Sequence, residues 1–172
     1  MSGVVYRDAE VSDAAALADF QRETFLATFG HLYNETDKAA YLAATYGARL
    51  QAAEIMDAAT WHRLAFVGAR MIGFAKAGAF KLPIEPEGAS VRELHRLYVT
   101  EDAKGAGVAA ALMDWAMARA RTEGADAMYL GVYQHNIRAQ RFYRRHGFEI
   151  VGEYFFNVGA TRDPEFIMRA AI

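Results

Sequence analysis

The second half of the chain alternates between strand-like and helix-like segments. We predict strands over residues 91–99, 128–132, 148–156 and 166–171, with helices over residues 107–121 and 136–145. Strand, helix, strand, helix, strand implies an α/β architecture around a mixed sheet. With 172 residues and 53% hydrophobic residues, the chain can bury a core, and we expect a single domain over residues 1–172.

The first half is less regular, but its apolar residues show both the helical and the strand periodicity. The expected elements are a strand over residues 4–7, a helix from a cap at Ser12 or Asp13 to Gly30, a helical stretch over residues 36–57, and strands over residues 62–67 and 71–75. Gly47 is a candidate break in the second helical stretch, and the proline-rich residues 82–88 predict a loop. No internal repeat or linker divides the sequence.

Composition excludes several classes of chemistry. The chain has no cysteine, which removes disulfides, thiolate metal sites and cysteine nucleophiles together. A formal charge of −2 gives no domain-wide basic surface, so we expect no nucleic-acid partner. His31 and His62 show no metal-ligand spacing, and we expect no metal. The most apolar stretch, residues 107–113, is far shorter than a membrane span, and the acidic start is unlike a secretory signal, so we expect a cytoplasmic protein with no membrane partner.

A glycine-rich turn joins the strand over residues 91–99 to the next helix. It holds Gly105 and Gly107 immediately before the helical residues. The first N–H groups of a helix have no intrahelical partner, and the helix dipole adds roughly half a positive charge, so a phosphate fits well there. Glycines let the backbone approach the anion without a Cβ in the way. The alternative is a tight turn that binds nothing.

Two other phosphate-binding loops fit poorly. No G-x-x-x-x-G-K-[ST] occurs, which excludes a Walker loop. Gly105-x-Gly107-x-x-Ala110 does match the dinucleotide fingerprint, and Asp126 lies about 20 residues further on. However, Asp126 precedes the following strand, whereas the fingerprint needs an acidic residue after it. A dinucleotide oxidoreductase is therefore a distant alternative.

Two ordered motifs resemble the GNAT N-acetyltransferase superfamily. Its acyl-CoA motif, Q/R-x-x-G-x-G/A after a strand, is similar to Leu97-Tyr98-Val99 followed by Lys104-Gly105-Ala106-Gly107-Val108-Ala109. Lys104 replaces the usual Gln or Arg, which keeps the positive charge but loses a planar donor. The second motif is similar to Asn136-x-x-Ala139-x-x-Phe142-Tyr143-x-x-x-Gly147-Phe148. The resemblance spans residues 93–148 and implies a GNAT fold, with a mixed, mostly antiparallel sheet flanked by helices.

Further segments resemble bacterial polyamine N-acetyltransferases of the sporulation-regulator type. They are Thr24-Phe25, Ala40-Tyr41-Leu42, Leu130-Gly131-Val132-Tyr133, Tyr154-Phe155-Phe156, and Asp163 with Phe166-Ile167-Met168. This resemblance implies acetyl transfer from acetyl-CoA to a primary amine such as a polyamine, by direct attack in a ternary complex. The absence of cysteine agrees with direct transfer. A homodimer is an open alternative to a monomer.

The resemblance also implies a catalytic set. Tyr143 takes the position of the general acid, since a phenol is protonated at neutral pH and can donate to the departing sulfur. The alternative is that Phe142 and Tyr143 only pack their helix. Glu93 and His95 share one face of a strand and are candidate bases, with ordered water or simple ion pairing as alternatives.

The same resemblance implies which residues hold acetyl-CoA. They are Leu97, Tyr98, Val99, Lys104, Gly105, Ala106, Gly107, Val108, Ala109, Asn136 and Phe142. Asn136 is also a candidate helix N-cap. On the acceptor side the resemblance points to the first two helices, where the polar candidates are Glu23, His31, Tyr33, Glu35 and Asp37.

Two functional alternatives stay open. A non-catalytic acyl-CoA-binding regulator would keep the glycine loop but would not need Tyr143. A peptide or protein N-terminal acetyltransferase would keep the chemistry and change the acceptor site.

Overall fold

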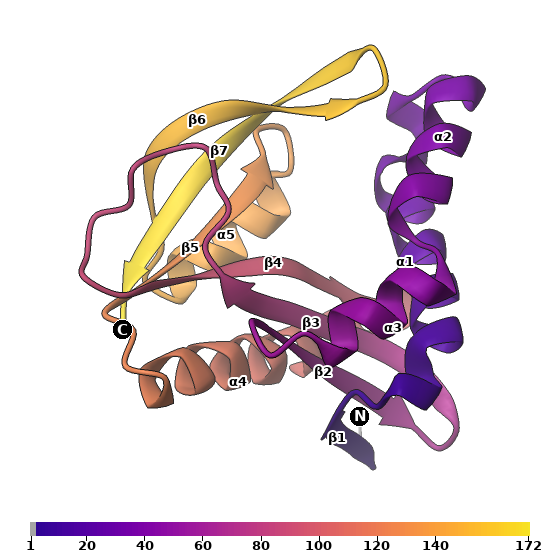
Figure 1. Ribbon diagram of the computed structural model, residues 1–172, viewed down its shortest axis with the longest axis horizontal. Helices are drawn as coiled ribbons and strands as arrows, with labels where there is room; N and C mark the ends of the chain where they lie inside the picture. Colours follow the sequence, from indigo (N-terminus) through magenta and orange to yellow (C-terminus); the bar gives the residue numbers. More distant parts are fainter. Residues whose placement is uncertain (1–2) are drawn as a thin grey trace.

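The computed structural model describes residues 3–172 and builds a seven-stranded sheet from them in the order β1-β2-β3-β4-β5-β7-β6 (Figure 1). The strands are β1 (Val4–Asp8), β2 (Thr60–Val67), β3 (Arg70–Ala79), β4 (Val91–Val99), β5 (Ala127–Tyr133), β6 (Glu149–Val158) and β7 (Thr161–Ala171). Only the β4–β5 pair is parallel among these strands. The expected mixed, mostly antiparallel sheet is therefore confirmed.

Five α-helices flank the described sheet. They are α1 (Ala14–Phe29), α2 (Glu35–Thr45), α3 (Ala48–Met56), α4 (Val108–Thr122) and α5 (Ile137–Arg145). The predicted helical stretch over residues 36–57 is divided at Gly47, as that glycine suggested. Two strands are longer than predicted, because β3 continues to Ala79 and β7 begins at Thr161. The start of β7 contains Asp163 and Pro164, poor strand formers that hold their place by pairing with β6.

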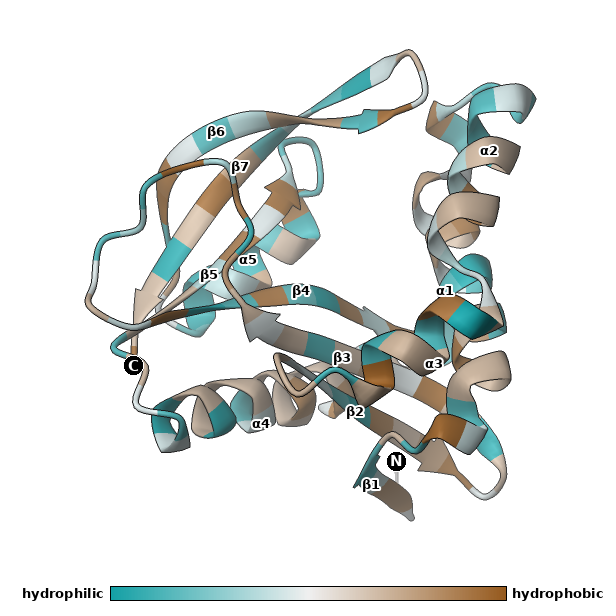
Figure 2. Ribbon diagram, viewed as in Figure 1, coloured by the Kyte–Doolittle hydropathy of each residue, from teal (hydrophilic) through white to brown (hydrophobic). Residues whose placement is uncertain are grey.

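Helix α4 covers one face of the sheet. Leu112, Met113 and Ala116 are fully buried there against β3 and β4, and α4 is largely apolar in Figure 2. Val108, at the start of α4, belongs to the same core. This packing fixes the N-terminus of α4 beside the end of β4.

Helices α1 and α3 pack on the opposite face. Leu17 and Phe20 of α1 contact Leu64 and Phe74, and the rings of Phe20 and Phe74 meet edge to face with centroids 5.9 Å apart. None of the described helices is both long and apolar enough to cross a membrane.

The sheet separates between β4 and β5, and this separation positions the site. The parallel pairing covers only Val91 to Glu93 on β4 and Ala127 to Tyr129 on β5. Immediately afterwards the β3–β4 register shifts, so that Lys76 pairs with Arg96 and Ala77 with Leu94, which leaves His95 as an extra residue. Such a β-bulge bends a strand and increases its twist. Beyond the bulge, β4 continues beside β3 alone, with its other edge free.

Candidate active site

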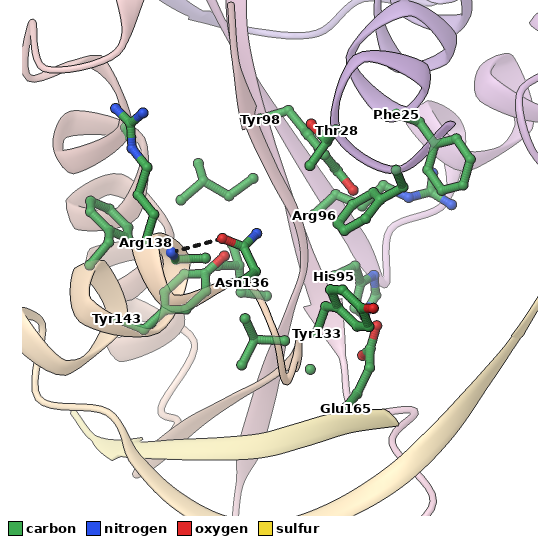
Figure 3. A pocket seen from close by; sticks show the side chains of 18 of the residues that line it. Phe25, Thr28, His95, Arg96, Tyr98, Tyr133, Asn136, Arg138, Tyr143 and Glu165 are labelled. Atoms are coloured by element: carbon green, nitrogen blue, oxygen red, sulfur yellow. Dashed lines mark hydrogen bonds between the residues drawn. The ribbon is translucent and has the colours of Figure 1, made fainter. Parts of the chain in front are cut away.

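One pocket connects the N-terminus of α4, the free edge of β4 and the helices α1 and α2 (Figure 3). Its volume is about 1080 Å³, at the upper end of the range for small-molecule sites. We call it the central pocket. Its size is sufficient for a large cosubstrate together with a second, smaller one.

The glycine loop forms one end of the central pocket. Gly105 and Gly107 have φ angles of +81° and +83°, in the left-handed region, and a Cβ on either would meet nothing within 4 Å. The first helical bond of α4 runs from the N–H of Ala111 to the carbonyl of Gly107, 3.0 Å away, so the preceding N–H groups of the turn are not used by the helix. Open space and unused donors at a helix N-terminus are suited to binding an anion.

The predicted loop residues do not all contribute side chains to this site. Lys104, Gly105, Gly107 and Ala109 line the central pocket, whereas Ala106 and Val108 do not. Val108 is fully buried in the core, so only its main chain can face a ligand. Ala110 also lines the pocket, but it was not among the residues predicted to hold the coenzyme, because the motif ends at Ala109. Lys104 makes an ion pair with Glu101.

Helix α5 supplies the second wall. Asn136 caps α5, with its Oδ1 accepting from the N–H of Ala139 at 3.1 Å, which confirms the expected cap, and it also lines the pocket. Tyr143 lines the pocket too, and its hydroxyl makes no hydrogen bond within residues 3–172. Burial raises the pKa of Tyr143, and the charge of Glu165 raises it further, so the phenol stays protonated. Phe142 both lines the pocket and packs against the main core.

Strand β4 brings five of the candidate residues to the central pocket, namely Glu93, His95, Leu97, Tyr98 and Val99. Glu93 Oε2 accepts from the N–H groups of Lys81 (2.7 Å) and Leu82 (3.1 Å), and burial raises its pKa. His95 Nε2 lies 2.8 Å from the carbonyl oxygen of Ala79, and burial lowers the pKa of His95 to about 4. His95 is therefore neutral, with Nε2–H donating to that carbonyl.

The β-bulge also turns Arg96 into the pocket, which strict alternation does not predict. Arg96 lies over the ring of Tyr46 at 4.9 Å and donates to Gln21 Oε1 at 2.6 Å. Gln21 in turn donates to Gln51 at 2.5 Å. This buried chain of hydrogen bonds ties β4 to α1 and α3.

The acceptor candidates on the first two helices lie mostly elsewhere. Tyr33 lines the central pocket, but Glu23, His31, Glu35 and Asp37 do not. Glu35 pairs with Lys38, and Asp37 Oδ2 accepts from the Asn34 side-chain amide at 2.8 Å and from the N–H of Ala160 at 3.3 Å. These two carboxylates therefore have local structural partners.

Strand β7 supplies the carboxylates instead. Asp163 and Glu165 are two residues apart, so they share a face of β7, and both line the pocket. The hydroxyl of Tyr33 donates to Asp163. The hydroxyl of Tyr154 donates to Glu165 Oε2 at 2.6 Å. We call the part of the pocket around these two carboxylates the acidic end.

Glu165 was not predicted from the sequence. Its neighbours across the sheet are Tyr133 on β5 and Tyr154 on β6, so the group is assembled from three strands. The sequence signal that could have indicated Glu165 is its position two residues after Asp163 and two before Ile167, which places all three on one face of the strand. No cluster of His, Cys, Asp and Glu suited to a metal occurs between residues 3 and 172.

Sequence comparison gives the family. The model of the Acetyltransferase (GNAT) family matches residues 16–148. A relative named as an uncharacterized N-acetyltransferase in Mycobacterium bovis is 36% identical over 128 residues, covering 74% of this chain and 80% of its own length. Another, from Lactobacillus delbrueckii subsp. lactis, is 25% identical over 172 residues, covering 100% and 99% of the two chains.

Solved structures agree with the fold. The PaiA N-acetyltransferase of Thermoplasma acidophilum in complex with coenzyme A has a TM-score of 0.81 at 22% identity, with 100% of both chains covered. A GCN5-related N-acetyltransferase of Rhodopseudomonas palustris has a TM-score of 0.76 at 20% identity, covering 100% of this chain and 98% of that one. The predicted fold and the predicted acyltransferase class are thus both confirmed. By its family match and its mycobacterial relatives, this chain belongs to the Acetyltransferase (GNAT) family of enzymes.

Proposed function

We propose that this enzyme transfers the acetyl group of acetyl-CoA to a primary amine, with both substrates in the central pocket at once. The observation that carries the proposal is the pocket itself, in which the free hydroxyl of Tyr143 and the acidic end share one space. Acetyl-CoA supplies an activated thioester, and the amine is the nucleophile. The absence of cysteine agrees with transfer in one step.

The glycine loop is proposed to hold the pyrophosphate. Support comes from the empty space at Gly105 and Gly107 and from the unused N–H groups at the start of α4. The free edge of β4 beyond Glu93 offers backbone donors and acceptors to the extended pantetheine arm. Arg138 and Arg141 line the same end of the pocket and can approach phosphates. The PaiA N-acetyltransferase of Thermoplasma acidophilum, which has a similar fold, is solved in complex with coenzyme A, and this supports a coenzyme site in the fold.

Tyr143 is proposed to act as the general acid. Its hydroxyl faces the pocket, and both causes of its raised pKa keep the proton on the oxygen until the sulfur departs. An N–H on the free edge of β4 is proposed to polarise the thioester carbonyl. Each of these groups acts on charge that develops during the transfer, so each lowers the barrier.

A polyamine is the acceptor class we propose. Asp163 and Glu165 are separated by about 7 Å along β7, a spacing comparable to that of two ammonium groups joined by a short methylene chain. Phe25, Phe29 and Phe156 give the adjoining wall an apolar surface for the methylenes. The short motifs that resemble polyamine N-acetyltransferases support the same class.

The test is a panel of amines assayed by release of the coenzyme thiol. We expect turnover with spermidine or spermine, and Tyr143→Phe should lower kcat by roughly 10²- to 10⁴-fold while calorimetry shows unchanged acetyl-CoA binding. Turnover only with peptides would replace the polyamine with a protein N-terminus. Binding of acetyl-CoA without turnover of any amine would indicate a non-catalytic module and overturn the proposal.

A further inference from the structure

Glu165 is a half-buried carboxylate whose role the family assignment does not explain. It lies on β7 beside Tyr133 of β5 and Tyr154 of β6, and it lines the central pocket (Figure 3). It is therefore accessible from the space that the substrates are proposed to occupy.

One oxygen of Glu165 is held and the other is available. Oε2 accepts the 2.6 Å hydrogen bond from Tyr154. Oε1 has no hydrogen-bond partner within residues 3–172. It is also not one of the fully buried polar atoms without a partner, so part of its surface faces open space. A carboxylate fixed through one oxygen and open at the other is prepared to accept a hydrogen bond from a ligand.

The other two carboxylates of the pocket are differently engaged. Glu93 already accepts two backbone N–H groups, which stabilise its charge. Asp163 already accepts the hydroxyl of Tyr33 at the far side of the acidic end. Glu165 has a single neutral donor, Tyr154, and no lysine or arginine of the described chain forms an ion pair with it.

Ionisation of Glu165 is correspondingly unfavourable. Burial raises its pKa, the charges of Asp163 and Glu93 raise it further, the bond from Tyr154 lowers it, and the result is a pKa of about 7. A group with a pKa near the working pH is suited to take up and release a proton. The titratable groups that interact with it from the surrounding elements are Tyr33, Glu93, Tyr98, Tyr143, Tyr154 and Asp163.

We propose that Glu165 binds the ammonium group of the acceptor through Oε1 and takes one of its protons before the attack. This rests on the proposed function, since it assigns a base to that reaction. Tyr154 is a positioning residue that keeps the carboxylate in place. Glu93 and His95, the bases suggested by the sequence, then line the site without receiving this proton.

The step balances as follows. The ammonium gives one proton to Glu165, and the freed nitrogen lone pair forms the N–C bond to the acetyl carbon while the C–S bond breaks. The sulfur takes the proton of Tyr143, which recovers one from the acylated nitrogen, and Glu165 releases its proton to solvent. Neutralising Glu165 removes one of the two causes that raise the pKa of Tyr143, so the first proton transfer makes Tyr143 a better acid.

The experiment compares Glu165→Gln with Glu149→Gln, an exposed glutamate on β6 that undergoes the same chemical change. With the amine that the wild type acetylates, we expect Glu165→Gln to lower kcat/KM for the amine by roughly 100-fold and to abolish the acidic limb of its pH profile. Acetyl-CoA affinity measured by calorimetry should be unchanged, which also shows that the variant is folded. Glu149→Gln should match the wild type.

Tyr154→Phe tests the same idea without removing the carboxylate. Its hydroxyl lowers the pKa of Glu165, so its loss should move the acidic limb to higher pH. Normal turnover and an unchanged pH profile in both variants would overturn this inference alone. Failure of the wild type to acetylate any amine would overturn the proposed function and this inference with it.

Discussion

The carboxylate of Glu165 lies over Gly131, in the space that a side chain at that position would need. A Cβ on Gly131 would stand 2.6 Å from Glu165 Oε2 and 2.7 Å from the hydroxyl of Tyr154. Glycine on β5 is thus a condition for the Glu165–Tyr154 pair. Three strands contribute to this arrangement. Gly131 on β5 leaves the space, the carboxylate of Glu165 on β7 occupies it, and the hydroxyl of Tyr154 on β6 donates a hydrogen bond to that carboxylate.

Gly131→Ala should therefore displace the pair. We expect the KM for the amine to rise about 10-fold or more, because the carboxylate must leave its position, while acetyl-CoA binding is retained. Amine-dependent thiol release measures this. Gly152→Ala on β6 is the matched control, since its Cβ would have only ordinary contacts at 3.9 Å. Equal KM values in the two variants would show that the amine does not use this carboxylate.

Gly107→Glu should abolish coenzyme binding. The new side chain would fill the anion site at the start of α4 and add a repelling charge, so calorimetry should show acetyl-CoA affinity reduced at least about 100-fold. Gly124→Glu controls for backbone strain, because Gly124 has a similar positive φ of +75° and equally open space, at the other end of α4. Retained affinity in Gly107→Glu would place the phosphates elsewhere.

Gln21→Ala should destabilise the fold. Gln21 is 1% exposed and joins Arg96 to Gln51, so its loss removes a hydrogen-bond partner from the buried Gln51 and from the half-buried Arg96. We expect the free energy of unfolding to fall by about 2 to 4 kcal/mol, measured by urea denaturation. Glu23→Ala, at an exposed position on the same helix, should change it by less than about 0.5 kcal/mol. A small effect of Gln21→Ala would mean that water replaces the amide.

His62 should make stability depend on pH. Burial, with help from the charge of Lys76, lowers the pKa of His62 to about 4 from an ordinary value of 6.5. The unfolded chain then binds the proton first, so the contribution of His62 is complete above about pH 6.5 and is lost as the pH falls towards 4. Relative to wild type, the free energy of unfolding of His62→Gln should rise by up to about 3 kcal/mol as the pH falls across that window.

Urea denaturation at several pH values measures this gain. Glu165 titrates in the opposite sense, but it is present in both proteins and cancels in the difference. His31→Gln, at an exposed position, is the matched control for the substitution itself. A pH-independent difference between His62→Gln and wild type would contradict a neutral, buried His62.

The parts predicted from the sequence are those fixed by local patterns. The turn at Gly105 and Gly107, the cap at Asn136 and the break at Gly47 each depend on a few neighbouring residues, and the structure has all three. The order of strands and helices follows from the same local information. Most of the residues that the motifs nominated for the coenzyme therefore line the central pocket, and their contact with the coenzyme stays a prediction.

The acidic end could not be found in this way. Glu165 reaches Gly131 and Tyr154 only because β7 inserts between β5 and β6, a pairing decided by the whole sheet. The bulge at His95, which turns Arg96 into the pocket, depends on pairing with β3. The sequence thus pointed to carboxylates on the first two helices, while the pocket takes them from β7. The polyamine acceptor, the cytoplasmic location and the oligomeric state stay predictions.

The central claim is that both substrates occupy one pocket and that the acetyl group passes directly between them. Initial rates measured at several fixed amine concentrations with acetyl-CoA varied test this most directly. We predict double-reciprocal plots that intersect, as a ternary complex requires. Parallel lines, together with an acetylated enzyme detected by mass spectrometry after mixing with acetyl-CoA alone, would contradict direct transfer.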